Sequence, residues 1–163
     1  MLFKPFLIER ILNCEKTQTR RVAKSNEMLS YPDGIEAVQY TRNDADCWRT
    51  KWQVGKTYAI CPGRGKHGVA RIEITAISRG DVRQISEADA RAEGFTNREE
   101  FLTTWIAIND KRALKLLNSG KAIIESADKP FDAEAFALFE EFLSHRPAAN
   151  YDAWSLTFRL VTP

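Results

Sequence analysis

Apolar residues in this chain switch several times between helical and alternating spacing, and these changes predict an α+β fold. A first short helix is expected from Pro5, a residue favoured in the first turn of a helix, to Leu12. Alternating stretches predict strands at 17–22, 38–40, 56–61, 69–78, 82–85 and 154–161. Because strands lie at both ends of the chain with helices between them, we expect a small closed or nearly closed β-barrel with flanking helices.

Three further helices are expected in the second half of the chain. Ser86 precedes the first of them, and Gly94 ends it in the left-handed conformation that glycine adopts easily. Asn97 has the position and chemistry of an N-cap for the second. Asp132 is the expected start of the third, after an ambiguous stretch at 110–130.

The length of 163 residues predicts one domain, 1–163, with insertions at about 23–53 and 107–150. The first insertion is polar and irregular around the turn at 32–34. Loops this long within a domain are usually functional or mobile.

Composition places the chain among ordinary soluble proteins, with 44% hydrophobic and 28% charged residues. We expect no membrane span, because no apolar run is long enough, and no signal peptide at the short, early-charged start. Cys14, Cys47 and Cys61 are an odd number without paired spacing, which favours free thiols and a cytoplasmic location. These cysteines and the two histidines lack ligand spacing, so neither a metal nor another cofactor is expected.

Charge is distributed unevenly along the chain. Residues 1–71 carry 13 Lys/Arg and 7 Asp/Glu, whereas residues 72–163 carry 11 and 15, so net charges of +6 and −4 give the overall +2. A basic first half suggests a polyanionic partner such as RNA or a nucleotide. Uneven scatter over the surface is an equally good interpretation.

The densest group of reactive side chains is K-x-x-T-x-R, formed by Lys16, Thr19 and Arg21. On a strand Thr19 and Arg21 share one face, and Lys16 at the entrance can curl over it. Such a group can bind a phosphate or polarise a carbonyl. Taken alone, the pattern is more often a solvated strand face.

Other candidates for substrate binding lie outside this motif. Arg64 and Lys66 belong to P-G-R-G-K-H-G, whose backbone N–H groups could cradle an anion, although a tight hairpin is the commoner meaning. Glu73 lies on a strand and could face the same site, or it could be part of a polar strand face. Trp52 lies among aromatic and basic residues that suit stacking on unpaired bases, yet core packing is the better interpretation for each tryptophan alone.

The order of several motifs resembles the ASCH domain, a PUA-like β-barrel, and is closest to small bacterial and phage ASCH proteins. These motifs are a helix ending in K-T-Q-T-R-R, then V-G-K-x-Y, R-I-E-I-T-A-I, I-S-E-A-D-A-R-A-E-G-F, E-F-x-x-x-W and the closing W-S-L-T-F-R-L. The resemblance covers residues 1–22, 54–106 and 151–161.

This resemblance implies a cleft on the barrel that binds RNA or nucleosides. Some small members are similar to amidohydrolases of N4-acetylcytidine that use a lysine, a threonine and a glutamate, and others have been proposed as ribonucleases. Matched residue by residue, these three catalytic positions are Lys16, Thr19 and Glu93. Two departures stand out: Cys14 replaces the usual glycine, and the smallest members lack both insertions, which could reshape the cleft.

The implied chemistry has clear requirements. A threonine is a weak nucleophile that needs a base, and a lysine can be that base only if its pKa falls through burial or a nearby cation such as Arg20 or Arg21. Glu93 could pass a proton to the leaving amine. The alternative is that Glu93 is a salt-bridge partner of the cations on the strand.

We therefore expect a protein that binds RNA or a modified nucleoside in a cationic cleft, with or without hydrolysis of an amide or phosphodiester. A non-catalytic RNA-binding module and a protein–protein adaptor that uses the insertions are the alternatives.

Overall fold

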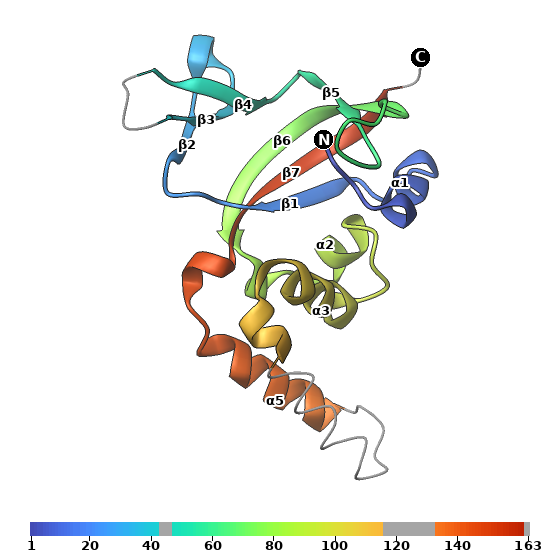
Figure 1. The fold of residues 1–163 in the computed structure, drawn as a ribbon, viewed down its shortest axis with the longest axis vertical. Helices are drawn as coiled ribbons and strands as arrows, with labels where there is room; N and C mark the ends of the chain where they lie inside the picture. Colours follow the sequence, from blue (N-terminus) through green and yellow to red (C-terminus); the bar gives the residue numbers. More distant parts are fainter. Residues whose placement is uncertain (43–46, 116–132, 162–163) are drawn as a thin grey trace.

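The structure is a computed structural model that describes residues 1–42, 47–115 and 133–161 (Figure 1). Its helices are α1 (Pro5–Leu12), α2 (Glu87–Ala92), α3 (Arg98–Asn109) and α5 (Ala133–Ser144). Its strands are β1 (Gln18–Val22), β2 (Glu27–Ser30), β3 (Ala37–Tyr40), β4 (Arg49–Gln53), β5 (Thr57–Ile60), β6 (Ala70–Asp81) and β7 (Asp152–Val161). The mixed α and β composition expected from the sequence is confirmed.

The strands form two antiparallel sheets, with order β1-β7-β6-β5 in one and β2-β3-β4 in the other. Within the described residues β1 and β5 are the edges of the larger sheet and do not pair with each other. The expected closure into a barrel is therefore wrong. The chain between these two edges builds the separate three-stranded sheet instead of bridging them (Figure 1).

Two segments differ from their sequence interpretation. The expected strand at 38–40 is present within β3, but it pairs on both sides with β2 and β4, so much of the segment at 23–53 is a small sheet. A register shift between Val38 and Gln39 interrupts the alternation that would have indicated longer strands. The expected strand at 82–85 is a 3₁₀ turn, Val82–Gln84, because the Asp81 side chain accepts from Arg83 N and caps the turn.

The helix ends in the second half form as expected. The Ser86 hydroxyl accepts from Asp89 N, and the Asn97 side chain accepts from Glu100 N. Gly94 has φ +82° after α2. The expected start at Asp132 lies outside the described residues, and α5 follows from Ala133. None of the described helices is long and apolar enough to cross a membrane.

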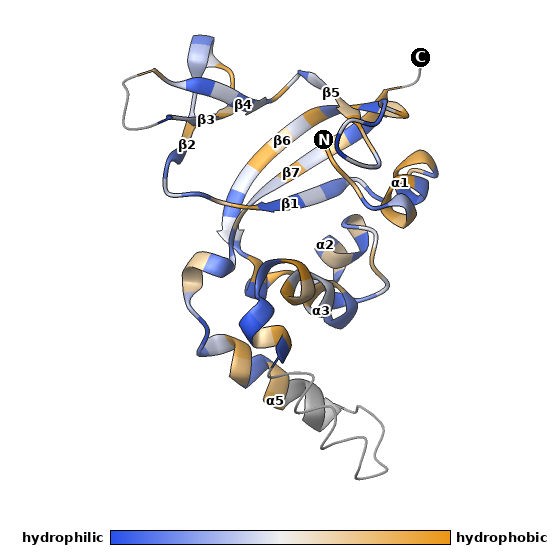
Figure 2. Cartoon of the chain, viewed as in Figure 1, coloured by the Kyte–Doolittle hydropathy of each residue, from blue (hydrophilic) through white to orange (hydrophobic). Residues whose placement is uncertain are grey.

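The buried apolar side chains form three clusters. The first joins α3 to the start of β7 and includes Trp105 and Tyr151. The second joins α1 to β5 and β6 and includes Ile11 and Ile60. The third joins the small sheet to β6 and β7 and includes Trp154. Strand β1 lies at the edge of the larger sheet and is coloured mainly hydrophilic in Figure 2. Its polar side chains are consequently available for a site.

Candidate functional site

A cleft of about 490 Å³ opens beside β1. Its lining includes four consecutive residues of that strand, Thr19, Arg20, Arg21 and Val22. Side chains alternate between the two faces of a strand, so four in a row can line one cleft only if the cleft runs along the strand edge. The edge position of β1 is therefore what creates the site.

The remaining walls come from three parts of the chain. Residues 2–5 and Leu7 contribute at the N-terminus, and Pro62 and Gly63 contribute from the turn after β5. The connection between α2 and α3 and one side of α3 contribute the rest. Aromatic lining residues are Phe3, Phe95, Phe101 and Trp105. The cleft thus combines aromatic walls with a strongly polar strand edge.

Lys16 reaches the cleft because the chain turns sharply after α1. Glu15 N and Lys16 N both donate to Arg10 O, and Cys14 between them and the helix has φ +59°. On the far side Gly94 lies against Lys16, since a Cβ built on that glycine would be 3.2 Å from Lys16 Cβ. A side chain at position 94 would displace the lysine.

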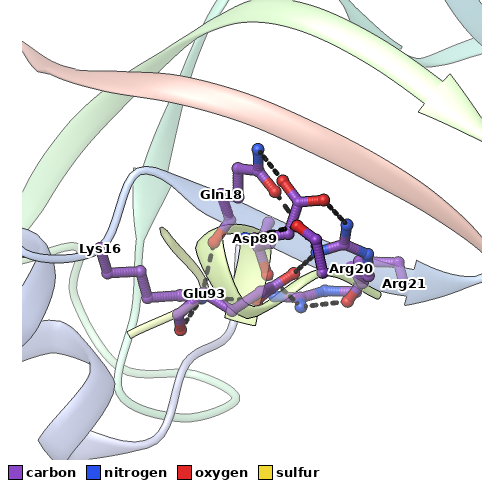
Figure 3. Close-up of polar contacts among 8 residues, drawn as sticks. Lys16, Gln18, Arg20, Arg21, Asp89 and Glu93 are labelled. Carbon is purple, nitrogen blue, oxygen red and sulfur yellow. Dashed lines mark hydrogen bonds and ion pairs between the residues drawn. The ribbon is translucent and has the colours of Figure 1, made fainter. Parts of the chain in front are cut away.

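Lys16 and Glu93 form a buried ion pair at the base of the cleft. Lys16 is 2% exposed and Glu93 3%. Lys16 Nζ donates to Glu93 Oε2 at 2.7 Å, to Glu93 O at 2.6 Å and to Gln18 O at 2.6 Å (Figure 3). Burial lowers the pKa of Lys16, an effect that Glu93 opposes and the charges of Arg21 and Arg20 reinforce.

A second layer of contacts holds Oε1, the other carboxylate oxygen of Glu93. Arg20 Nη1 donates to Glu93 Oε1 at 3.3 Å, and Arg20 Nη2 lies 3.5 Å from Asp89 Oδ2 (Figure 3). Gln18 Nε2 donates to Asp89 Oδ1 at 3.1 Å. Asp89 and Glu93 are four residues apart, which places both on the same side of the helix end. Glu93 is therefore fixed between two cations.

Thr19 is 1% exposed and contacts a third cation. Arg21 Nη1 donates to Thr19 Oγ1 at 2.6 Å and to Arg20 O at 2.8 Å, and Arg21 Nη2 donates to Leu2 O at 3.1 Å. The Arg21 guanidinium lies 5.0 Å from the Phe3 ring centroid. Burial lowers the pKa of Arg21, and Glu93 opposes this. A guanidinium so placed would stabilise negative charge on the threonine oxygen.

The structure brings together Lys16, Thr19, Arg20, Arg21 and Glu93, all of which line the cleft. The other four candidates are elsewhere. Arg64 and Lys66 are exposed and follow the lining residues Pro62 and Gly63. Glu73 forms an ion pair with Arg159 at 2.9 Å. Trp52 is buried in the core, and Lys51 Nζ lies 3.9 Å from its ring centroid. For Glu73 and Trp52 the alternative interpretations, a polar strand face and core packing, fit these contacts better. Arg64 and Lys66 lie in the connection between β5 and β6, and their role in binding stays a prediction.

Sequence reasoning did not assign the aromatic lining residues Phe3, Phe95, Phe101 and Trp105 to the site. It also missed two polar residues that contact the site, Gln18 and Asp89. The i, i+4 spacing of Asp89 and Glu93 was a usable signal, since it places two carboxylates on one side of a helix. Nothing in the sequence marked Gln18, whose role depends on the approach of α2 to β1.

Within the described residues no group of His, Cys, Asp and Glu has the arrangement of a metal site. The three cysteines are free thiols.

Comparison with known proteins gives structural likenesses at low sequence identity. No family model matches the chain, and no curated protein matches it. The chain is similar to protein EF3133 from Enterococcus faecalis V583, of the DUF984 family, with 14% identity, a TM-score of 0.47, and coverage of 95% of this chain and 69% of the other. It is also similar to an ASCH domain from Lactobacillus crispatus JV V101, with 16% identity, a TM-score of 0.42, and coverage of 93% and 68%.

Proposed function

We propose that the cleft binds a nucleoside, or an unpaired nucleotide of RNA, and hydrolyses an amide on its base. A cleft of about 490 Å³ is of the size that holds small organic ligands. Its aromatic lining suits the flat faces of a base, and Arg20 and Arg21 suit its oxygens or a neighbouring phosphate.

The observation that carries the catalytic part is the buried Lys16–Glu93 pair, 2.7 Å apart, in the same cleft as the Thr19 hydroxyl. Thr19 Oγ1 attacks the amide carbonyl carbon, Lys16 accepts the hydroxyl proton, and Glu93 donates a proton to the departing amine. Water then releases the acyl group from Thr19 as a carboxylic acid.

The protons balance only if the ion pair first becomes neutral. A lysine ammonium has three N–H bonds and no lone pair. Transfer of one proton from Lys16 Nζ to Glu93 Oε2, across 2.7 Å, gives an amine that can accept and a carboxylic acid that can donate. After attack and expulsion of the amine the pair is ionic again, which returns the site to its starting charges.

A non-catalytic RNA-binding module is the second candidate, and one observation favours it. All three N–H bonds of Lys16 already have acceptors, namely Gln18 O, Glu93 O and Glu93 Oε2. An ammonium held in this way is also a good fixed charge for a phosphate or a base oxygen.

A product assay separates the two candidates. The protein is incubated with N4-acetylcytidine and, separately, with short single-stranded RNAs, and products are resolved by chromatography. Thr19→Val removes only the hydroxyl at nearly constant shape, and Thr17→Val is the matched control because Thr17 is exposed and does not line the cleft. Release of cytidine by the wild type and by Thr17→Val, but not by Thr19→Val, supports hydrolysis.

Binding without turnover would instead support the module. In that case affinity for single-stranded RNA should fall steeply with salt, since phosphate contacts release counterions. If both substrates stay intact and neither binds, the proposal is wrong.

A further inference from the structure

The open edge of β1 directs its backbone groups into the cleft in a fixed pattern. Phe158 N donates to Thr17 O, and Ala23 N donates to Asp152 O, so the odd-numbered residues of this segment face β7. In an antiparallel pair the residues between them point their N–H and C=O groups the other way. The backbone N–H and C=O of Gln18, Arg20 and Val22 therefore point toward the open edge.

Two of the carbonyls on this edge are already occupied by cations of the same protein. Gln18 O accepts from Lys16 Nζ at 2.6 Å, and Arg20 O accepts from Arg21 Nη1 at 2.8 Å. A docked β-strand would need those carbonyls as acceptors, so this edge is poorly suited to pairing with a peptide. What remains on this edge is the Val22 carbonyl and three N–H donors, those of Gln18, Arg20 and Val22. Among these donors the Arg20 N–H is the one that directly follows Thr19, and it lies beside two cations, which suits a ligand oxygen that accepts hydrogen bonds.

We propose that the backbone N–H of Arg20 is the oxyanion donor of this site. It follows Thr19 directly in the chain and points to the cleft edge that Thr19 and Arg20 line. A rigid backbone donor beside the nucleophile stabilises the charge that develops on a carbonyl oxygen under attack. The inference rests on the proposed function, because Thr19 is the attacking group.

The step balances in atoms and electrons. A lone pair on Thr19 Oγ1 forms a bond to the carbonyl carbon, and the hydroxyl proton passes to Lys16. The π electrons of the carbonyl move to its oxygen, which becomes the oxyanion that Arg20 N–H binds. When the intermediate collapses, the C–N bond breaks and the amine leaves with the proton from Glu93.

The test compares Arg20→Pro with Arg20→Ala. Both variants lose the guanidinium and its contact with Glu93, but only proline also loses the backbone N–H. Proline is tolerated on an edge strand where its nitrogen faces away from the sheet, and the residue before it must be extended, as Thr19 is within β1. Thermal unfolding of both variants checks that the strand is intact.

The expected result is a kcat about 100-fold lower for Arg20→Pro than for Arg20→Ala, with a similar KM, because an oxyanion donor acts on the transition state. Equal kcat values in two folded variants would overturn the assignment while leaving hydrolysis itself established.

A second measurement does not depend on turnover. Acetate offers a carboxylate oxygen in place of the oxyanion, and the amide proton of Arg20 is followed by NMR as acetate is added to the wild type. A downfield shift at Arg20 that exceeds the shifts at Thr19 and Arg21, whose N–H groups face β7, supports the donor even if N4-acetylcytidine is not cleaved. If acetate leaves the Arg20 amide unshifted, the assignment is wrong.

Discussion

Two buried ionic clusters in this protein invite comparison. In the first, Lys16 and Arg20 contact Glu93 beside the cleft, Arg21 adds a third positive charge, and Asp89 contacts Arg20. In the second, Asp110 accepts from Arg146 at 3.0 and 3.1 Å, from Tyr151 OH at 3.0 Å and from Ala113 N at 3.0 Å. Both clusters are well hydrogen-bonded, so saturation alone does not distinguish a functional site from a structural one.

Their surroundings and net charges differ. None of Asp110, Arg146 and Tyr151 lines the cleft. In their cluster one carboxylate, Asp110, is paired with one guanidinium, Arg146, so the cluster has no net charge. The cluster beside the cleft has three cations against two carboxylates, and four of these five groups line the cavity. An excess of charge at a cavity wall is what a bound anion or oxyanion would neutralise, whereas the neutral cluster joins α3 to the segment before β7.

The strongest test of this contrast removes the buried pair from the cleft. The double variant Lys16→Met/Glu93→Leu removes both charges of the pair and leaves Arg20 beside Asp89, so its free energy of unfolding should fall by less than the about 3–5 kcal/mol expected when one partner of a buried pair is removed alone. Hydrolysis should fall by at least about 100-fold, because proton transfer is lost. Urea unfolding and the product assay are the measurements. Retained turnover would show that the pair is structural.

The matching test removes the carboxylate of the second cluster, Asp110. Asp110→Ala leaves Arg146 and the Tyr151 hydroxyl without their acceptor, and the free energy of unfolding should fall by about 3 kcal/mol. Turnover by the folded fraction should be unchanged. Asp152→Ala is the control, since its pair with Arg79 is largely exposed and should contribute less than about 1 kcal/mol. Equal losses in both variants would contradict the assignment.

Acid should weaken the Asp110 cluster in a defined range of pH. Burial alone would raise the pKa of Asp110, but bonds from Arg146, Ala113 N and Tyr151 outweigh it and lower the pKa from 3.8 to about 2. Because the unfolded chain takes up this proton first, the stabilisation is complete above about pH 4 and disappears as pH falls toward 2. The loss should be about 2 kcal/mol.

Denaturant unfolding at several pH values measures this effect. The wild type should lose more stability between pH 4 and 2 than Asp110→Asn does, since asparagine does not titrate there. Parallel curves for the two proteins would contradict the proposed linkage. Burial and the bond to Asp110 also raise the pKa of Tyr151 to about 12, so this phenol stays protonated at neutral pH.

The smallest effect is expected at Cys14, in the turn that delivers Lys16 to the cleft. Its φ of +59° destabilises the folded state of a non-glycine residue by about 1–2 kcal/mol, and glycine would remove this strain. Glycine would also lower the free energy of unfolding by about 0.5–1 kcal/mol, because it makes the unfolded chain more flexible. Cys14→Gly should therefore raise the free energy of unfolding by about 0.5 kcal/mol. Cys47 is another exposed cysteine, and Cys47→Gly should not raise the free energy of unfolding. A lower stability for Cys14→Gly would contradict this balance.

Local signals in the sequence predicted local structure well. Capping at Ser86 and Asn97, the turn at Gly94 and the terminal strand all depend on neighbouring residues, and each is present. The open sheet was not predictable in this way. Closure depends on whether β1 meets β5, and these strands are separated by the 34 residues between Val22 and Thr57, so no local pattern shows whether they pair.

The residues of the candidate site also fall into those that local sequence predicted and those that it did not. Lys16, Thr19, Arg20 and Arg21 are close in sequence and were found together, and Glu93 joined them only through the family resemblance. For Trp52 and Glu73 the sequence left two interpretations open, because alternation does not reveal which face of a strand a second sheet covers. Asp89 could be assigned to the site only from the packing of α2 on β1, which the sequence does not show.

Trapping the acyl intermediate tests the central claim most directly. Wild-type protein is mixed with N4-acetylcytidine, quenched in acid and digested, and the peptide that contains Lys16 and Thr19 is analysed by mass spectrometry. The account predicts an acetyl ester on Thr19 that disappears in Thr19→Val. Turnover with no acetyl group on this peptide, or with the acetyl group on Lys16 instead, would contradict it.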